Sequence, residues 1–128
     1  MQKQERSLLI AVVEDNPRIR QLLEEEILDE GHRMLSFPTA EEFLATFDQQ
    51  AIDLVLLDLM LPGMDGLSCL QQLTERQSTN CKPRVVIVTA LNDDEKRQQA
   101  LAAGAEDYVL KPDLFLRLPE ILNSSAQD

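Results

Sequence analysis

The chain has 128 residues, 44% of them hydrophobic, and its 23 acidic against 12 basic residues give a net charge of −11. This length fits one domain at 1–128, with its core at about 8–122 and polar tails at 1–6 and 123–128. The negative charge repels phosphate backbones and anionic lipids, so direct binding to nucleic acid or to a membrane surface is not expected. No apolar stretch reaches the ~18 residues of a membrane span, and MQKQERS lacks the apolar segment of a signal peptide, so we expect a cytoplasmic location.

The two cysteines and the single histidine limit the chemistry available to the side chains. Cys69 and Cys81 lack the CxxC spacing of a redox or zinc motif, and we assign them no role. His32 follows Gly31 in a polar connection, where a surface position is expected rather than metal ligation. A serine–histidine or cysteine–histidine nucleophile pair would depend on this one histidine, so that class of enzyme is not expected.

The first half of the chain alternates apolar runs with segments of helical spacing. The continuous apolar run LLIAVV at 8–13 predicts a buried strand, and Asn16-Pro17 then opens an amphipathic helix. Gly31 ends that helix, and 33–37 is a short alternating strand. The segment TAEEFLATF, which follows it, places its large apolar residues on one helical face. The first half of the chain therefore predicts two consecutive units, each a strand followed by a helix.

The second half continues the same alternation. Residues 53–57 form a third strand, followed by a helix, and 84–88 form a fourth strand, followed by a helix at about 93–103. A fifth strand is predicted at 106–110. Because most of these strands are apolar on consecutive residues, they fit a parallel sheet that is buried on both faces. We therefore expect an α/β fold with a doubly wound five-stranded parallel sheet.

The last predicted helix contains a proline. Leu114, Leu118, Ile121 and Leu122 keep a helical spacing, but Pro119 has no N–H to donate and would clash with a preceding carbonyl inside a helix. Such a proline costs ~3 kcal/mol in a helix interior. We therefore expect a short turn and then a new helix with Pro119 in its first turn.

Polar side chains follow four of the five predicted strands. In open parallel sheets, ligands bind beyond the carboxyl ends of the strands, so these residues would share one edge. Each also has an ordinary structural alternative as a helix cap, a loop residue, a strand residue or a solvated charge. Their coincidence at one edge favours a site. The residues are Glu14, Asp15, Asp58, Thr89 and Lys111.

This set of side chains suits a particular chemistry. Several carboxylates at close range repel one another and favour a cation, and their hard oxygen atoms suit Mg²⁺. A carboxylate such as Asp58 can act as a nucleophile and form an aspartyl phosphate. The Lys111 ammonium would neutralise charge on the transferring group, and Thr89 would donate a hydrogen bond to a phosphoryl oxygen.

At this point the sequence closely resembles the receiver domains of two-component response regulators. The motifs AVVEDN, LVLLDLMLPGMDGL, VVIVTALNDD and GAEDYVLKP carry the resemblance, in this order and over nearly the whole chain. The resemblance implies the flavodoxin-like receiver fold with strand order 2-1-3-4-5. It also implies a signalling switch in which Asp58 accepts a phosphoryl group from a phosphohistidine in a Mg²⁺-dependent reaction.

The resemblance further assigns roles to individual residues. It implies that Asp15, Asp58 and the backbone carbonyl of Met60 ligate Mg²⁺, with assistance from Glu14 through water. Thr89 and Lys111 would hold the phosphoryl oxygens, and the Lys111-Pro112 peptide bond would be cis.

A conformational switch is also implied. Thr89 would move toward the phosphoryl group, beside the small Ala90, while Tyr108 rotates inward. The alternative for Tyr108 is a partly buried strand residue whose hydroxyl lies in water. The helix at about 93–103 has an alanine-rich face with Leu101 as its only large apolar residue, so we expect a weakly packed element that could shift between two states.

Some features depart from the resemblance or leave alternatives open. The family commonly has Phe after Lys-Pro and a regular last helix, whereas this chain has Asp113 and Pro119. We therefore expect a monomer or a weak dimer. Partners would be a sensor histidine kinase or a histidine phosphotransfer protein, with an unknown downstream protein target.

Two other function classes remain as alternatives. One is a receiver-like docking module that is not phosphorylated, against which the intact Asp58, Thr89 and Lys111 argue. The other is an aspartate-nucleophile phosphohydrolase, which would carry a second aspartate where this chain has Met60. In the leading interpretation the chain is not an enzyme, since it catalyses only its own phosphorylation and dephosphorylation.

Overall fold

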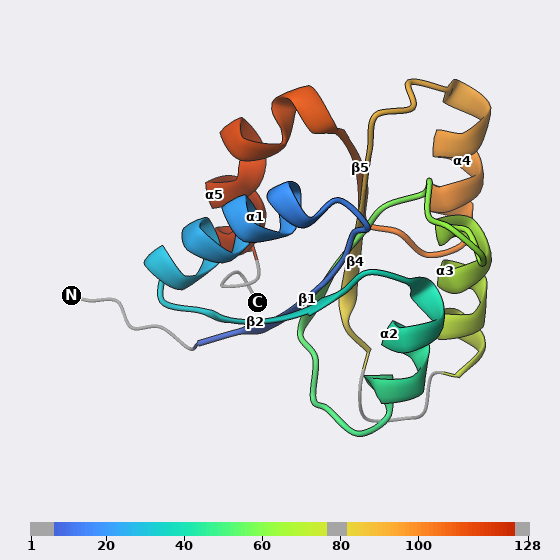
Figure 1. Cartoon of the computed structure of the whole chain (residues 1–128). Coiled ribbons are helices and arrows are strands. Elements are labelled where there is room, and N and C mark those ends of the chain that lie inside the picture. Colours follow the sequence, from blue (N-terminus) through green and yellow to red (C-terminus); the bar gives the residue numbers. More distant parts are fainter. Residues whose placement is uncertain (1–6, 77–81, 125–128) are drawn as a thin grey trace.

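The structure is a computed structural model that describes residues 7–76 and 82–124 (Figure 1). Residues 1–6 and 125–128 of the predicted tails, together with Cys81, lie outside this part of the chain.

A five-stranded parallel sheet forms the centre of the molecule, with strand order β2-β1-β3-β4-β5. This confirms the predicted fold class and strand order, and each strand agrees with its predicted bounds to within one residue. The strands are β1 (Leu9–Val13), β2 (Arg33–Phe37), β3 (Leu54–Leu57), β4 (Arg84–Thr89) and β5 (Asp107–Leu110).

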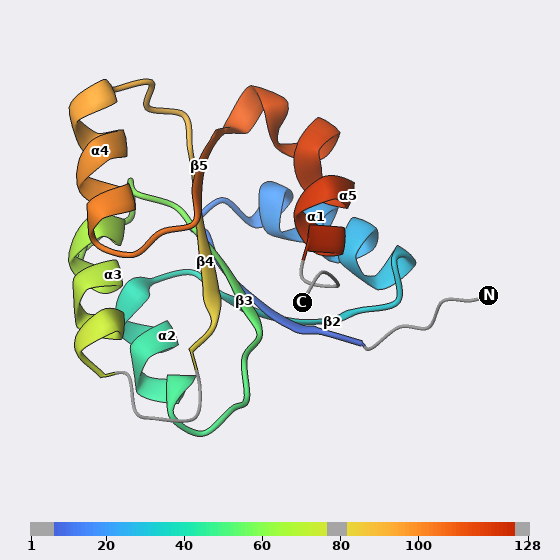
Figure 2. The same ribbon diagram turned by 180° about the vertical axis from the view of Figure 1, so that it is seen from behind.

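The helices cover both faces of the sheet. One face carries the first and the last helix, and the other face carries the three between them (Figures 1 and 2). The helices are α1 (Pro17–Asp29), α2 (Ala40–Phe47), α3 (Gly66–Glu75), α4 (Asp94–Ala102) and α5 (Leu114–Ser124), with a 3₁₀ turn, η1 (Lys111–Asp113), before the last.

Each face of the sheet has its own apolar core. Alternate residues of the strands point to opposite faces, so Ile10 and Val12 pack under α1 and α5, whereas Ala11 and Val13 pack under α2, α3 and α4. Strand β3 is buried along its whole length, because helices cover it on both sides. The sheet is therefore a rigid platform for the residues that follow its strands.

Polar side chains close the first turns of four helices. Asn16 accepts the backbone N–H groups of Arg18 and Ile19 at 2.9 and 3.2 Å, so it caps α1. Asp65 caps α3 by accepting from Ser68, and Thr39 and Asp93 cap α2 and α4. Asn16 is therefore the cap of α1, and the Asp15 carboxylate is not needed for this role.

The predicted break in the last helix is wrong. Helix α5 continues from Leu114 to Ser124 with Pro119 in its interior. The helix buries Leu114, Leu118, Ile121 and Leu122 against β1, β3, β4 and β5. Burial of such a side chain stabilises by ~1.5–3 kcal/mol, so the four together outweigh the ~3 kcal/mol cost of the proline.

Two further expectations near the carboxyl edge are corrected. The Lys111-Pro112 bond is trans, and the chain passes directly from β5 into η1 through it. In α4, the buried residue is Ala100, whereas Leu101 points outward and is exposed. Helix α4 is therefore packed even more weakly than its sequence indicates, because its one large apolar side chain contributes little to the core.

Candidate functional site

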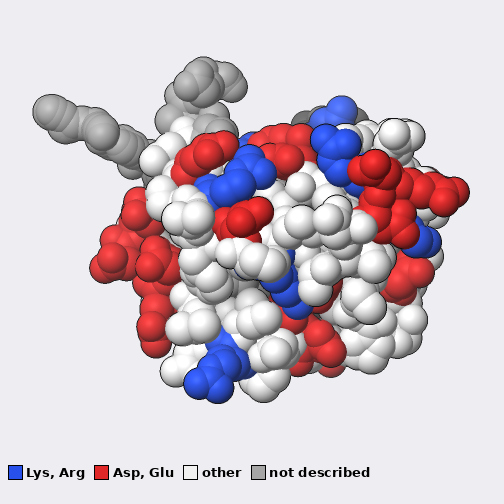
Figure 3. Space-filling model, turned by 90° about the horizontal axis from the view of Figure 1, so that it is seen from above, with Lys and Arg blue, Asp and Glu red and all other residues white. Residues whose placement is uncertain are grey.

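The carboxyl edge of the sheet brings the predicted site residues together. Val13 pairs with Leu57 in the parallel register of β1 and β3, so the residues that follow them, Glu14 and Asp58, become neighbours. Thr89 pairs with Leu110, which places Lys111 just beyond the same edge. Figure 3 views the molecule from above relative to Figure 1, and acidic side chains dominate the charged groups on this face, with basic ones between them.

Three carboxylates form a cluster at this edge. One oxygen atom from each of Glu14, Asp15 and Asp58 lies within 4.8 Å of the others. Glu14 and Asp58 are each only 3% exposed, whereas Asp15 is exposed. A dense group of hard oxygen atoms with one open side is the donor set that suits Mg²⁺, which retains several waters when bound. The residues present therefore fit a magnesium ion.

Lys111, the first residue of η1 directly after β5, reaches the two buried carboxylates. Its Nζ atom lies 3.0 Å from Asp58 Oδ2 and 3.0 Å from Glu14 Oε1. One ammonium therefore faces two buried carboxylates, with the third beside them. This arrangement leaves net negative charge at the edge and holds the ammonium against the Asp58 and Glu14 carboxylates.

The pKa values of Glu14 and Lys111 reflect these contacts. Burial raises the pKa of Glu14, as does the Asp58 charge, although hydrogen bonds from Lys111 and from the backbone of Asn16 oppose the shift. For Lys111, burial by itself would lower the pKa, but hydrogen bonds to Asp58 and Glu14 outweigh it, and the pKa is raised. The lysine therefore stays charged.

Backbone contacts fix the chain immediately after Asp58. The Met60 N–H donates to Asp58 Oδ1 at 3.0 Å, so the Met60 peptide lies beside the carboxylate. The Met60 side chain is 57% exposed and points away from the core. A Cβ atom on Gly66 would overlap the Asp58 carbonyl oxygen, which explains why only glycine fits where α3 begins.

Thr89 and Tyr108 are connected through the loop that follows β4. Thr89 is fully buried, and its Oγ1 accepts the Leu91 N–H at 3.1 Å. The Tyr108 hydroxyl donates to the Leu91 carbonyl at 2.6 Å, so it is bonded to the protein, contrary to the alternative that placed it in water. Burial raises the pKa of Tyr108, and the Asp93 charge adds to the shift. Ala90, between Thr89 and this contact, is exposed.

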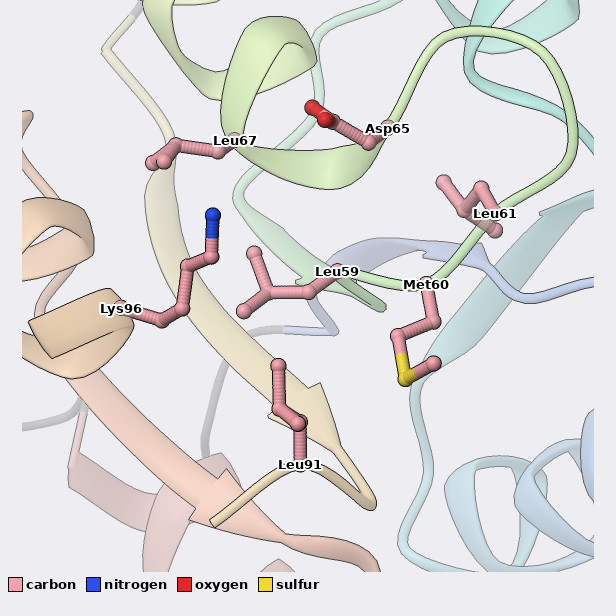
Figure 4. Close-up of a pocket in the computed structure, with 7 residues that line it drawn as sticks. All are labelled: Leu59, Met60, Leu61, Asp65, Leu67, Leu91 and Lys96. Atoms are coloured by element: carbon pink, nitrogen blue, oxygen red, sulfur yellow. The ribbon is translucent and has the colours of Figure 1, made fainter. Parts of the chain in front are cut away.

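A pocket of ≈ 460 Å³ adjoins the site between α3 and α4 (Figure 4). Met60 and Leu91 contribute to its wall, and each is joined by its backbone N–H to a site residue, Asp58 and Thr89 respectively. Lys96 reaches into the pocket from α4. The pocket lining is otherwise mostly apolar and consists of Leu59, Leu61, Asp65 and Leu67.

Arg20 also contributes to this edge, although it was not predicted from the sequence. Its Nη1 atom donates to the Glu14 carbonyl at 2.7 Å, which holds the end of β1 against α1. The signal was present, because Arg20 lies in the first turns of the helix that follows Glu14 and Asp15.

Cys69, given no role, is buried, and burial raises the pKa of its thiol to about 12. His32, expected at the surface, is partly buried and accepts the Leu8 N–H at 3.0 Å through Nδ1.

The fold and this edge define a class of protein. A parallel sheet of order 2-1-3-4-5 with carboxylates, a threonine and a lysine beyond its strands is the architecture of a receiver-type signalling domain. The family model described as "Response regulator receiver domain" matches residues 10–123. The chain therefore belongs to the receiver domains of two-component response regulators, which are phosphorylation-activated signalling switches.

Curated relatives agree with this assignment. The chain is 33% identical to the transcriptional regulatory protein ResD of Bacillus subtilis over 122 residues, covering 92% of this chain and 49% of ResD. It is 37% identical to the transcriptional regulatory protein AruR of Pseudomonas aeruginosa, covering 80% of this chain and 43% of AruR. The chain thus spans about half the length of these relatives or less.

Solved structures show the same fold. The BeF₃-activated DrrB receiver domain matches with a TM-score of 0.75 and 34% identity, covering 92% of this chain and 99% of that one. The response regulator TrrA of Thermotoga maritima, in complex with Mg²⁺ and BeF, matches with a TM-score of 0.80 and 31% identity, covering 91% and 97%.

Proposed function

We propose that this receiver domain accepts a phosphoryl group on Asp58 from a phosphohistidine. The observation that carries the proposal is the position of Asp58. Its carboxylate is fixed at the end of a buried strand, within 3.0 Å of the Lys111 ammonium and inside a cluster of carboxylates. In the transfer, an Asp58 oxygen bonds to phosphorus while the phosphorus–nitrogen bond breaks, and the electron pair remains on the leaving imidazole.

Mg²⁺ supports this reaction in the proposed mechanism. Glu14, Asp15, Asp58 and the Met60 carbonyl would hold the ion, which when bound neutralises negative charge on the site and on the phosphoryl oxygens. The magnesium complex of TrrA and the carboxylate cluster of this chain support the assignment. Lys111 would contact a phosphoryl oxygen, because its ammonium already contacts the nucleophile.

The switch would pass through Thr89, Ala90 and Tyr108. Thr89 Oγ1 accepts the Leu91 N–H, and the Leu91 carbonyl accepts the Tyr108 hydroxyl. If Thr89 turned toward a phosphoryl oxygen, it would release the Leu91 N–H and disturb the contact with Tyr108. Helix α4 follows this loop and buries only one alanine, so it can adjust at low cost and alter the surface that a partner reads.

The proposed partners follow from the family. A sensor histidine kinase or a histidine phosphotransfer protein would supply the phosphoryl group, and we propose a monomer or a weak dimer. A downstream protein target would recognise the switched surface. The curated relatives are transcriptional regulatory proteins about twice as long as this chain or longer, so their output lies beyond the part that this chain matches. Beyond its own phosphorylation and dephosphorylation, the domain would catalyse no reaction. No helix among the described residues is long and apolar enough to span a membrane.

One experiment tests the proposal directly. The protein is incubated with Mg²⁺ and acetyl phosphate or phosphoramidate, and its intact mass is measured. We expect a single phosphoryl adduct that is stable in acid and labile in base, and that disappears when Mg²⁺ is removed by a chelator. An unmodified wild-type protein, or an adduct that persists in Asp58→Asn, would overturn the assignment.

A further inference from the structure

The loop between Asp58 and α3 is held at its ends by local contacts. The Met60 N–H donates to Asp58 Oδ1 at 3.0 Å, and the Gly66 N–H donates to the Leu59 carbonyl at 2.9 Å. These bonds fix where the loop leaves β3 and where it enters α3. They do not by themselves fix the tip, residues 62–64, which extends away from the strand.

A carboxylate from another helix holds the tip. The Met64 N–H donates to Glu41 Oε2 at 3.0 Å, across 23 residues of sequence. Gly63, just before Met64, has φ = +74°, a left-handed conformation that favours glycine. A Cβ atom at Gly63 would lie 2.7 Å from the same Glu41 oxygen, so the carboxylate sits directly against the turn.

Glu41 itself is held on a rigid support. It lies in the first turn of α2, where Thr39 caps the helix by accepting the Glu42 N–H at 3.1 Å. The opposite face of α2 buries Phe43 and Phe47 in the core. Since α2 is anchored by this burial, the Glu41 carboxylate is a fixed point against which the loop can rest.

The same loop carries groups of the candidate site. It begins at Asp58, includes the Met60 peptide, and forms one wall of the pocket beside the site (Figure 4). Leu59 and Leu61 are buried, so the loop is packed on one side and tied by Glu41 at its tip. If the tip is released, the chain between Met60 and Gly66 gains freedom, so the Met60 carbonyl can shift relative to the Asp58 carboxylate.

We infer that Glu41 is a positioning residue for the magnesium site, because its hydrogen bond to Met64 sets the position of the loop that carries the Met60 carbonyl. This inference rests on the proposed function, in which that carbonyl ligates Mg²⁺. Glu41 does not touch the ion or the phosphoryl group in this proposal. It acts only through the loop, in the manner of residues that orient metal ligands from behind.

The test compares Glu41→Ala with Glu42→Ala. Both substitutions remove an acidic side chain from the first turn of α2, so they change net charge and the interaction with the helix dipole alike. Only Glu41 accepts a hydrogen bond from the loop. Mg²⁺ binding is measured by isothermal titration calorimetry, exchange of the Met64 amide by NMR, and the unfolding midpoint without Mg²⁺ by circular dichroism.

We expect Glu41→Ala to raise the Mg²⁺ dissociation constant by roughly three- to tenfold, which is the worth of one hydrogen bond. The Mg²⁺ concentration that half-saturates phosphorylation should rise by the same factor, while the rate at saturating Mg²⁺ stays within about twofold. The Met64 amide should exchange faster. Glu41→Gln should restore most of the affinity, because an amide oxygen can also accept from Met64.

Several results would overturn the inference. It fails if Glu41→Ala binds Mg²⁺ as the wild type does, or if Glu42→Ala weakens binding equally. If Glu41→Ala does not fold, the Glu41→Gln comparison decides, because loss of affinity with an intact fold and a slowly exchanging Met64 amide contradicts the positioning role. A wild-type protein that binds no Mg²⁺ would instead remove the proposed function on which the inference rests.

Discussion

The two edges of the sheet both gather charged side chains, but they satisfy them in opposite ways. At the amino edge, Arg84 forms a bidentate pair with Glu106, in which Nε and Nη2 donate to the two carboxylate oxygens at 2.8 and 2.6 Å. Asp53 Oδ2 accepts the Leu9 N–H at 2.8 Å at the same edge. At the carboxyl edge, one ammonium group, that of Lys111, contacts both Glu14 and Asp58. The carboxylates outnumber the cation there, and Asp15 adds a third.

This difference distinguishes charged groups that hold parts of the fold together from charged groups that are available to bind a cation. At the amino edge, Arg84 has fixed partners for Nε and Nη2 and connects β4 to α5, because Nη2 also donates to the Ile121 carbonyl at 3.0 Å. Its Nη1 atom is buried without a hydrogen-bond partner among the described residues. Charges at the carboxyl edge repel one another and remain incompletely balanced in the folded chain. An excess of buried negative charge is a cost to stability that a cation can remove, which is why the binding chemistry belongs to that edge.

The largest expected effect comes from two aspartates at opposite ends of the same strand. Asp58 follows β3 and Asp53 precedes it. Asp58→Asn should abolish the phosphoryl adduct, a loss of at least ~100-fold in rate, because an amide is not a nucleophile toward phosphorus. Asp53→Asn should be phosphorylated at the wild-type rate, since the amide oxygen can still accept from Leu9. Intact mass after incubation with acetyl phosphate measures both, and equal behaviour of the two variants would contradict the comparison.

The second prediction removes a cation from the amino edge. Arg84→Met should lower the free energy of unfolding by roughly 2 kcal/mol, because the contacts with Glu106 and the Ile121 carbonyl are lost. Phosphorylation of Asp58 should be unaffected. Arg97→Met, on the exposed surface of α4, serves as the control and should leave stability unchanged. Urea unfolding measures the effect, and a stability loss no larger than that of the control would show that the Arg84 cluster does not hold the edge.

The third prediction concerns relief of charge at the carboxyl edge. Mg²⁺ at ten times its dissociation constant should stabilise the wild type by ~1.4 kcal/mol through preferential binding to the folded state. Asp58→Asn should lose most of this gain, while Arg84→Met should keep it. Thermal unfolding with MgCl₂ is compared with NaCl at the same ionic strength, because salt screening also weakens repulsion. Equal stabilisation by the two salts would argue against a specific site.

The smallest expected effect is the titration of Tyr108, which joins β5 to the loop at the carboxyl edge. The chain has one tyrosine and no tryptophan, so absorbance at high pH reports this residue alone. Its pKa is raised above 10 by burial and by the Asp93 charge. The phenolate should therefore form at higher pH in the folded protein than in urea.

The sign of the linked stability follows from the same shift. The contribution of Tyr108 is fully present below pH 10 and is lost as the pH rises through the folded pKa. Spectrophotometric titration of the native and unfolded protein gives both values. A native pKa at or below that of the unfolded chain would mean that burial and the Asp93 charge do not favour the protonated phenol.

Local sequence patterns were sufficient to predict most of the fold. Apolar runs such as LLIAVV and RVVIV mark strands whose surfaces are both buried, and these strands form where they were predicted. The prediction for α5 failed because the proline rule is local, whereas the burial of Leu114, Leu118 and Ile121 is a property of the assembled sheet. The outward position of Leu101 could not be predicted from the sequence either, because helical spacing does not say which face of the helix meets the sheet.

The amino-acid sequence was enough to place these side chains at the carboxyl edge, because Glu14, Asp58 and Lys111 each follow a strand of a parallel sheet and Thr89 ends one. How these side chains share their contacts depends on the packing of the whole fold. Lys111 divides between Glu14 and Asp58, Tyr108 bonds to Leu91, and Glu41 holds the loop after Asp58 from another helix. Such contacts join residues far apart in the chain, and packing of the helices on the sheet determines them.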